Sequence, residues 1–142
     1  MRTLTLTLTL TLTLTLTLNP NPDQVLALMA AAPSQPAHDI IVAHCRDAHH
    51  QTRRGCVECL TQQLRSDPTE PHGAAALQHA LEKLGPLLGA LKAVTADADA
   101  SVRTAAGKCF WALHAHRPTE CADFMAKLDP AQQRMLKRCQ PK

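Results

Sequence analysis

The residues best suited to chemistry in this chain are its cysteines and histidines. Cys56 and Cys59 form a Cys-x-x-Cys pair, and His49 and His50 lie a few residues ahead of it. These residue types at this spacing are typical of one half of a zinc site, but a structural zinc site needs four ligands and usually a second closely spaced pair. No second pair follows along the chain. The spacing therefore favours a protein without a bound metal, and no motif indicates a cofactor.

The cysteines also bear on the redox environment of the protein. An even number of cysteines is typical of a disulfide framework only in a small secreted chain. The sequence carries no convincing export signal, and several of its cysteines fall at core-type positions of predicted helices. We therefore expect a reducing, cytoplasmic environment. The six predicted free thiols are Cys45, Cys56, Cys59, Cys109, Cys121 and Cys139.

The rest of the composition argues against catalysis and favours a helical fold. No nucleophile motif, phosphate-binding loop or metal triad is spaced for chemistry, so we predict no enzyme, no catalytic residue and no small-molecule substrate. Of the 142 residues 45% are hydrophobic, mostly Ala and Leu, with two Phe and no Tyr. Because Ala and Leu are strong helix formers and β-formers are scarce, close-packed helices are expected.

The net charge places a weak constraint on partners. The formal charge of +3, from 15 basic and 12 acidic residues, is mild. It permits an acidic partner without demanding a nucleic acid, which usually binds a strongly clustered basic face. The clearest basic cluster lies near the C-terminus, where Lys and Arg also complement a helix macrodipole. Nucleic-acid binding is therefore a disfavoured alternative that depends on Arg134, Lys137, Arg138 and Lys142.

The N-terminal region differs from the rest of the chain because it has a low-complexity, repetitive sequence. Residues 3–18 are eight consecutive Thr-Leu dipeptides, followed by Asn-Pro-Asn-Pro. Strict alternation is typical of a β-strand, but this one would span about 50 Å and nothing else in the chain could pair with it. A signal peptide that starts at Arg2 and is cleaved near 30–32 is a disfavoured alternative, and the alternating threonines argue against a membrane span. We predict a disordered tail and linker over 1–22 and a domain over 23–142.

From residue 23 the hydrophobic periodicity becomes helical. The stretch 74–95 places Leu at alternating steps of four and three, and Gly85-Pro86 is expected to kink or split it. The stretch 66–73, with two prolines and a glycine, is expected to be a loop. The last helix is expected to have Asp129 as its N-cap and proline at its first position. The stretches that contain the other predicted helices are 23–33, 38–48, 52–65, 97–118, 119–128 and 129–139.

Two of these stretches read as copies of each other. Arg53 aligns with Arg103 and Cys59 with Cys109, and each copy is a helix, a tight turn and a second helix that opens with a basic residue. The offset is slightly longer than the period of about 40–47 residues of HEAT and armadillo repeats, and the proline-rich loop accounts for the excess. We therefore predict an all-α, HEAT/armadillo-like superhelix of about two hairpins plus flanking helices. Trp111 is expected to pack against the following helix, with a partner for its indole N–H. The predicted core includes Val57, Leu60, Leu81, Leu88, Cys109, Phe110 and Leu113.

The sequence also carries a family resemblance. The stretch DADASVRTAAGKCFWALHAHRPTECADFMAKLDPAQQRML, residues 97–136, resembles the last repeat and closing helices of the TOG domains of CLASP-family microtubule-associated proteins. The matching features are Asp-x-Asp before Val-Arg, the aromatic pair Phe110-Trp111, His116, and Leu-Asp-Pro before a Gln-rich helix. AHDIIVAHCRDAHHQTRRGCVECL, residues 37–60, is similar to the preceding repeat. The resemblance implies a partial TOG-like HEAT-repeat domain of the cytoskeleton that binds tubulin or microtubules through the turns inside each hairpin.

This resemblance implies that successive turns along one edge of the stacked hairpins form the binding site. Because tubulin is acidic, Arg53, Arg54 and a protonated histidine are the expected contacts. Arg53 and Arg103 also have a structural interpretation, in which each arginine pairs with an aspartate of a neighbouring turn and holds the repeats in register. For Arg103, which lies close to Asp97 and Asp99, this structural role is favoured. The predicted partner-binding residues are His49, His50, Gln51, Arg53, Arg54, Ser101 and Arg103.

Two other interpretations stay open at this point. The chain could be a general HEAT or armadillo adaptor, with other HEAT-repeat proteins among its partners and a concave groove that binds a peptide. It could also be a remnant without tubulin binding, because it resembles only the last repeats of a TOG domain. If the chain is such an adaptor, the residues that line the concave groove would bind the partner, and the residues of the turns would not.

Overall fold

A computed structural model of the chain describes residues 35–142, and this part is helical, without strands. The predicted tail over 1–22 and the predicted helix over 23–33 lie outside the described residues. The helices are α3 (Gln35–His44), α4 (His50–Leu64), α5 (Pro71–Glu82), α6 (Leu84–Thr95), α7 (Ala100–His114), α8 (Pro118–Ala126) and α9 (Pro130–Arg138).

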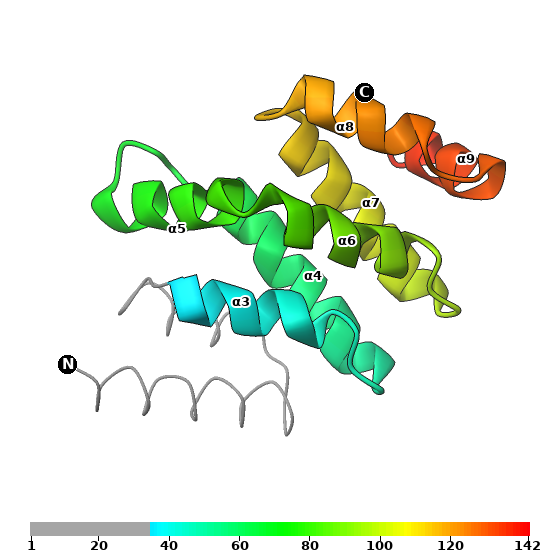
Figure 1. Cartoon of the computed structure of the whole chain (residues 1–142), viewed down its shortest axis with the longest axis horizontal. Coiled ribbons are helices and arrows are strands. Elements are labelled where there is room, and N and C mark those ends of the chain that lie inside the picture. Colours follow the sequence, from blue (N-terminus) through cyan, green and yellow to red (C-terminus); the bar gives the residue numbers. More distant parts are fainter. Residues whose placement is uncertain (1–34) are drawn as a thin grey trace.

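The helices stack as consecutive hairpins (Figure 1). Helix α3 packs on α4, and α6 packs on α7. The two second helices, α4 and α7, share the most extensive interface of the described part, while α3 also touches α6. Helix α8 packs against α7, and α9 closes the end of the stack against α6 and α7. The predicted all-α, HEAT-like architecture is confirmed.

The core lies where the first and second helices of the hairpins face each other. Ala, Leu and Cys at helical spacing give each helix one apolar side, and burying a Leu or Phe side chain contributes about 1.5–3 kcal/mol. Five of the seven predicted core residues are confirmed as fully buried. These are Val57, Leu60, Cys109, Phe110 and Leu113.

The other two predicted core residues, Leu81 and Leu88, are only half-buried and pack against the edge of the core. The prediction treated 74–95 as one helix, whereas the structure breaks it at Lys83, which has non-helical dihedral angles (φ −113°, ψ 67°). Beyond this break the inward side of α6 is shifted from the leucine pattern, so that Leu91 is buried whereas Leu88 lies at the edge of the core. The residues of α6 that face the core are Leu87, Ala90, Leu91 and Val94.

Proline positions account for where α5 and α6 begin. The predicted split is confirmed, because Pro86 lies in the first turn of α6, where its missing N–H has no helical acceptor to lose. Helix α5 begins at Pro71, inside the stretch expected to be a loop, since proline is well suited to the first helical position. A methyl group on Gly73 would overlap the backbone carbonyl of Asp67, so the preceding loop packs closely against this first turn.

The start of α9 is fixed by a capping box, and the predicted N-cap is confirmed. The Asp129 carboxylate accepts a hydrogen bond from the Gln132 N–H (Oδ1–N 2.8 Å), and the Gln132 side chain accepts one from the Asp129 N–H. The Gln132 amide also donates to the Thr95 hydroxyl at 3.0 Å. This contact ties α9 to the end of α6 and so positions the turn that follows α6.

Two aromatic side chains join helices that are distant in sequence. The Trp111 indole N–H donates to the carbonyl of Leu136 at 2.7 Å, which confirms that the indole N–H has a partner and places that partner on α9. The rings of Trp111 and Phe110 meet edge to face, with centroids 5.0 Å apart. Just beyond the C-terminal end of α7, a ring nitrogen of His116 bonds the carbonyl of Leu64 (Nε2–O 2.7 Å), one of the carbonyls that the end of α4 leaves without a helical partner.

Candidate functional site

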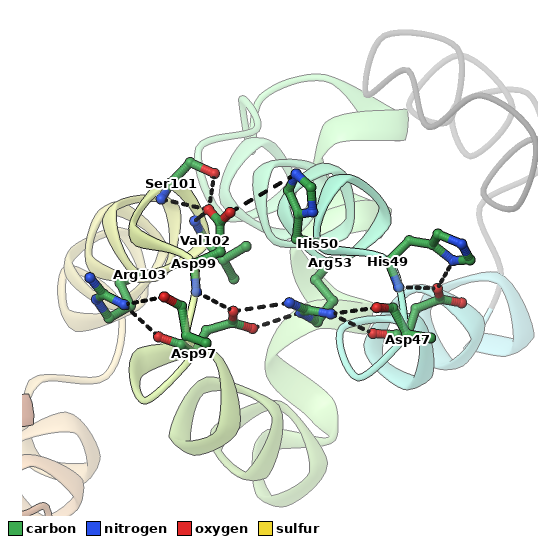
Figure 2. Close-up of polar contacts among 11 residues, drawn as sticks. Asp47, His49, His50, Arg53, Asp97, Asp99, Ser101, Val102 and Arg103 are labelled. Carbon is green, nitrogen blue, oxygen red and sulfur yellow. Dashed lines mark hydrogen bonds and ion pairs between the residues drawn. The ribbon is translucent and has the colours of Figure 1, made fainter.

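The turn that leads into α4 is held by one aspartate and one arginine. The Asp47 carboxylate accepts a hydrogen bond from the His49 backbone N–H (Oδ1–N 2.9 Å). The Nη1 group of Arg53 donates to the backbone carbonyls of Asp47 (2.9 Å) and Ala48 (3.1 Å). The backbone groups in the turn between α3 and α4 have no hydrogen-bond partner within a helix, and these contacts provide one (Figure 2).

The turn that leads into α7 repeats this arrangement at the aligned positions. The Asp97 carboxylate accepts from the Asp99 N–H at 2.9 Å. The Nη1 group of Arg103 donates to the carbonyls of Asp97 (2.6 Å) and Ala98 (2.9 Å). Arg103 was expected to pair with the Asp97 or Asp99 carboxylate, and this detail is wrong, because the guanidinium binds backbone carbonyls instead. The repeat seen in the sequence thus extends to individual hydrogen bonds.

A charged pair joins the two turns. Arg53 Nε and Nη2 donate to Asp97 Oδ2 (2.6 Å) and Oδ1 (3.0 Å), the two-pronged geometry that suits a guanidinium and a carboxylate. The Arg53 side chain is 18% exposed and that of Asp97 is 9% exposed. Burial alone would raise the pKa of Asp97, but the hydrogen bonds from Arg53 and the Asp99 N–H outweigh it, and this pKa lies below its ordinary value. The pair therefore fixes the spacing and orientation of the turns.

The two turns differ at the N-caps of their helices. The Asp99 carboxylate accepts hydrogen bonds from the N–H groups of Ser101 (2.8 Å) and Val102 (3.3 Å). The hydrogen bond from the Ser101 hydroxyl and those from the two N–H groups lower the pKa of Asp99. The aligned residue of the first turn, His49, has the same extended backbone but makes no side-chain cap. A ring nitrogen of His50 lies 3.9 Å from Asp99 (Nε2–Oδ2), which adds a second contact between the turns.

We call residues 47–53 and 97–103 together the turn ridge. The structure brings six of the seven predicted partner-binding residues together on it, and Figure 2 labels all of these except Gln51. Four of them are exposed: the His49 side chain by 81%, the His50 side chain by 52%, and also Gln51 and Ser101. Arg53 and Arg103 lie partly buried beneath them. The seventh, Arg54, lies away from the turns on α4, with its Nε 3.8 Å from Glu58 Oε1.

A comparison with known families identifies the chain. The family model described as CLASP N terminal matches residues 19–137. The chain belongs to the CLASP N-terminal family. The resemblance to CLASP proteins is thereby confirmed, and the chain is a member of a family of cytoskeletal regulators. Among the described residues of this CLASP N-terminal domain, no helix is long and apolar enough to cross a bilayer.

Five of the six cysteines of this CLASP N-terminal domain are buried in the core, and Cys139 at the end of α9 is partly exposed. Cys56 and Cys59 are 0% exposed, whereas the neighbouring His49 and His50 point to solvent. In the part of the chain that the structure describes, no three His, Cys, Asp or Glu side chains gather closely enough to bind a metal. Burial raises the pKa of the Cys109 thiol to about 12. Such thiols stay protonated at neutral pH and are poor nucleophiles and metal ligands.

Sequence reasoning missed a groove between α4 and α7. It has a volume of about 550 Å³, and we call it the α4/α7 groove. The signal was present in the spacing of Arg54, Glu58 and Arg65, which fall on one side of a helix. Arg54 was instead assigned to the turns because it neighbours Arg53. The lining residues are Arg54, Glu58, Thr61 and Gln62 of α4, the C-cap residue Arg65, and Ser101, Thr104, Ala105 and Lys108 of α7.

Proposed function

We propose that this CLASP N-terminal domain is a non-enzymatic module that binds tubulin or microtubules along the turn ridge, and that it acts in the cytoplasm on the cytoskeleton. Family membership supports the cytoskeletal setting. The rigid pairing of the two turns supports the location, because contacts fixed in advance lose less conformational entropy on binding. Flat partner surfaces suit such a row of turns at one edge of stacked hairpins.

The observation that carries the proposal is the unequal use of two equivalent arginines. Arg53 engages its Nε, Nη1 and Nη2 groups, of which Nε and Nη2 bind the Asp97 carboxylate. Arg103 has the same backbone contacts through Nη1. In the described part of the chain, no carboxylate pairs with its other nitrogens. A guanidinium has five N–H donors in a fixed fork that matches a carboxylate. Arg103 is therefore suited to bind an Asp or Glu of tubulin as Arg53 binds Asp97.

Replacement of Arg103 by lysine tests this assignment. Lysine keeps the positive charge and can still reach a turn carbonyl, but it lacks the forked donors. We expect Arg103→Lys to weaken binding of the full chain to purified tubulin about fivefold, the loss of roughly 1 kcal/mol for a charge-assisted hydrogen bond. Co-sedimentation with microtubules and fluorescence titration with unpolymerised tubulin would measure this change.

The matched control is Arg134→Lys on α9, an exposed position outside the turn ridge. The control should bind as the unmodified chain does, and circular dichroism should show equal helicity for both variants. Unchanged binding by Arg103→Lys, or an equal loss in both variants, would overturn the assignment of Arg103. Absence of binding by the unmodified chain would overturn the function itself.

A second candidate function, a general protein-interaction adaptor, is favoured by one observation. The α4/α7 groove lies beside the turn ridge and carries polar and basic side chains. A ligand could bind this groove whether or not tubulin binds the turn ridge.

A further inference from the structure

The α4/α7 groove carries positive charge that the fold itself does not use. Arg65 and Lys108 are exposed on its two walls, and neither has an ion-pair partner within the described residues. Arg54 contacts Glu58 only through a long, exposed pair at 3.8 Å, which is worth little to stability. Three cations face one carboxylate, so the groove is complementary to a negatively charged ligand.

Short side chains also line the groove. Ser101, Thr104 and Ala105 of α7 and Thr61 of α4 are among its lining residues, and their small size is consistent with the space of about 550 Å³ between the helices. Long cationic side chains rise on both sides of it, with apolar stems and charged ends. A ligand in this groove would meet methyl and hydroxyl groups below and guanidinium and ammonium groups at the rim.

The spacing of the cations limits the shape of the ligand. Arg54 and Arg65 lie on one side of α4 and are separated by about 17 Å along the helix axis. An extended chain covers this distance with about five residues. A compact anion such as a single phosphate would reach only one of the cations at a time. The groove therefore fits an extended segment with several carboxylates better than it fits a small anion.

We propose that the α4/α7 groove is a docking site for an extended acidic peptide, whose Asp and Glu carboxylates bind Arg65, Lys108 and Arg54. The small lining residues leave room for the backbone of the peptide. The hydroxyl groups of Thr104 and Ser101 donate to Ala100 and Asp99, so their oxygens are left to accept hydrogen bonds from peptide N–H groups. This site lies along the helices beside the turn ridge and shares Ser101 with it. It does not depend on the proposed binding of tubulin.

The test uses the full chain and a fluorescein-labelled peptide of alternating glutamate and glycine. Fluorescence anisotropy at low ionic strength would measure its affinity for the unmodified chain and for the double variant Arg65→Glu/Lys108→Glu. We expect the double variant to bind the peptide at least about tenfold more weakly, because two attractive charge contacts become repulsive. A peptide of alternating glutamine and glycine should not bind either protein.

The matched control is Arg134→Glu/Lys137→Glu on α9, which changes the net charge by the same amount at exposed positions. It should retain affinity for the glutamate peptide within about twofold, a change below 0.5 kcal/mol. An equal loss in both double variants would overturn the proposal, since binding would then follow net charge alone. Absence of peptide binding, or tighter binding of a single-stranded RNA that the groove variant alone abolishes, would also overturn it. Tubulin co-sedimentation of the same variants separates this outcome from a failure of the turn ridge.

Discussion

Equivalent arginines of the turn ridge can either stabilise the fold or remain available to a partner, and the sequence pattern does not distinguish these two roles. Arg53 and Arg103 occupy the same place in their repeats, yet Arg53 closes a salt bridge inside the domain and Arg103 does not. The hydrogen bonds that Arg53 donates to Asp97 raise the pKa of Arg53, and the pKa of Asp97 lies below its ordinary value. Of the two roles predicted for Arg53, contact with a partner or a pair with an aspartate of a neighbouring turn, the structure shows the second.

The Arg53–Asp97 pair should stabilise the fold. Arg53→Lys should lower the free energy of unfolding by about 2 kcal/mol, because a lysine cannot replace the forked contact to a mostly buried carboxylate. The control Arg54→Lys, at an exposed position, should change it by less than about 0.5 kcal/mol. Urea denaturation followed by circular dichroism would measure both. Equal stability of the two variants would contradict a structural role for the pair.

The pair should also make the fold sensitive to acid. The native pKa of Asp97 is lowered, so its contribution to stability is present above the unfolded value of about 3.9 and is lost as the pH falls through the native value. Arg53→Lys weakens the contact that lowers this pKa. We therefore expect the midpoint of acid unfolding to move to higher pH in this variant and to stay unchanged in Arg54→Lys.

The burial of the thiols predicts which cysteine reacts first. Burial raises the pKa of Cys109 to about 12 and that of Cys121 to about 11, and Cys45 and Cys56 are shifted in the same direction. Cys139 is the most exposed of the six. In the native chain, iodoacetamide followed by peptide mass analysis should therefore modify Cys139 first, and the other five only after denaturation. Rapid modification of Cys56 and Cys59 in the native chain would contradict this description of the core.

At the scale of the elements, α4 and α7 are equivalent helices that begin differently. Asp99 caps α7 through its carboxylate, whereas the aligned His49 makes no side-chain cap to α4. Both residues have extended backbone dihedral angles, −96° and 124° for His49 and −85° and 126° for Asp99. The backbone of α4 is thus already arranged for an aspartate cap.

His49→Asp should therefore stabilise the domain. An added N-cap contributes about 1 kcal/mol, and the negative charge also suits the helix N-terminus. Thermal denaturation should show a higher midpoint for His49→Asp, and Asp99→Ala should lower it by a similar free energy. If His49→Asp were destabilising, the two turns would not be equivalent in the way that their hydrogen bonds indicate.

The sequence predicted the hairpins, the repeat alignment and the N-cap of α9 because these depend on local signals. It misplaced Leu88 because the break at Lys83 rotates α6 relative to the leucine pattern. It also missed that Trp111 bonds α9 and that Arg54 lines the α4/α7 groove. Both depend on how non-adjacent helices pack, and hydrophobic spacing within one helix carries no information on that packing.

At the scale of the whole molecule, the domain presents two adjoining surfaces. The turn ridge runs across the starts of α4 and α7, and the α4/α7 groove runs along the same two helices. Ser101 belongs to both surfaces. The groove is rimmed by arginine and lysine, whereas the turn ridge carries polar groups and histidines above arginines that are partly engaged. One domain could therefore contact a folded partner and an acidic segment side by side.

Tubulin binding along the turn ridge is tested most directly by a variant that adds negative charge there without loss of stability. His49→Asp/Gln51→Glu places two carboxylates at exposed positions of the first turn of α4, where acidic residues suit the helix N-terminus. The control Arg134→Gln/Lys137→Gln removes two positive charges from α9 and so changes the net charge equally. Microtubule co-sedimentation of the full chains should be measured from low to physiological ionic strength.

The unmodified chain should bind most strongly at low ionic strength and lose affinity as salt screens its contacts. The ridge variant should bind about tenfold more weakly than the control at low ionic strength, because two repulsive contacts at roughly 0.2–1 kcal/mol each face an acidic surface. Equal binding of the ridge variant and the control would contradict the central claim, as would binding that is absent in the unmodified chain at every ionic strength.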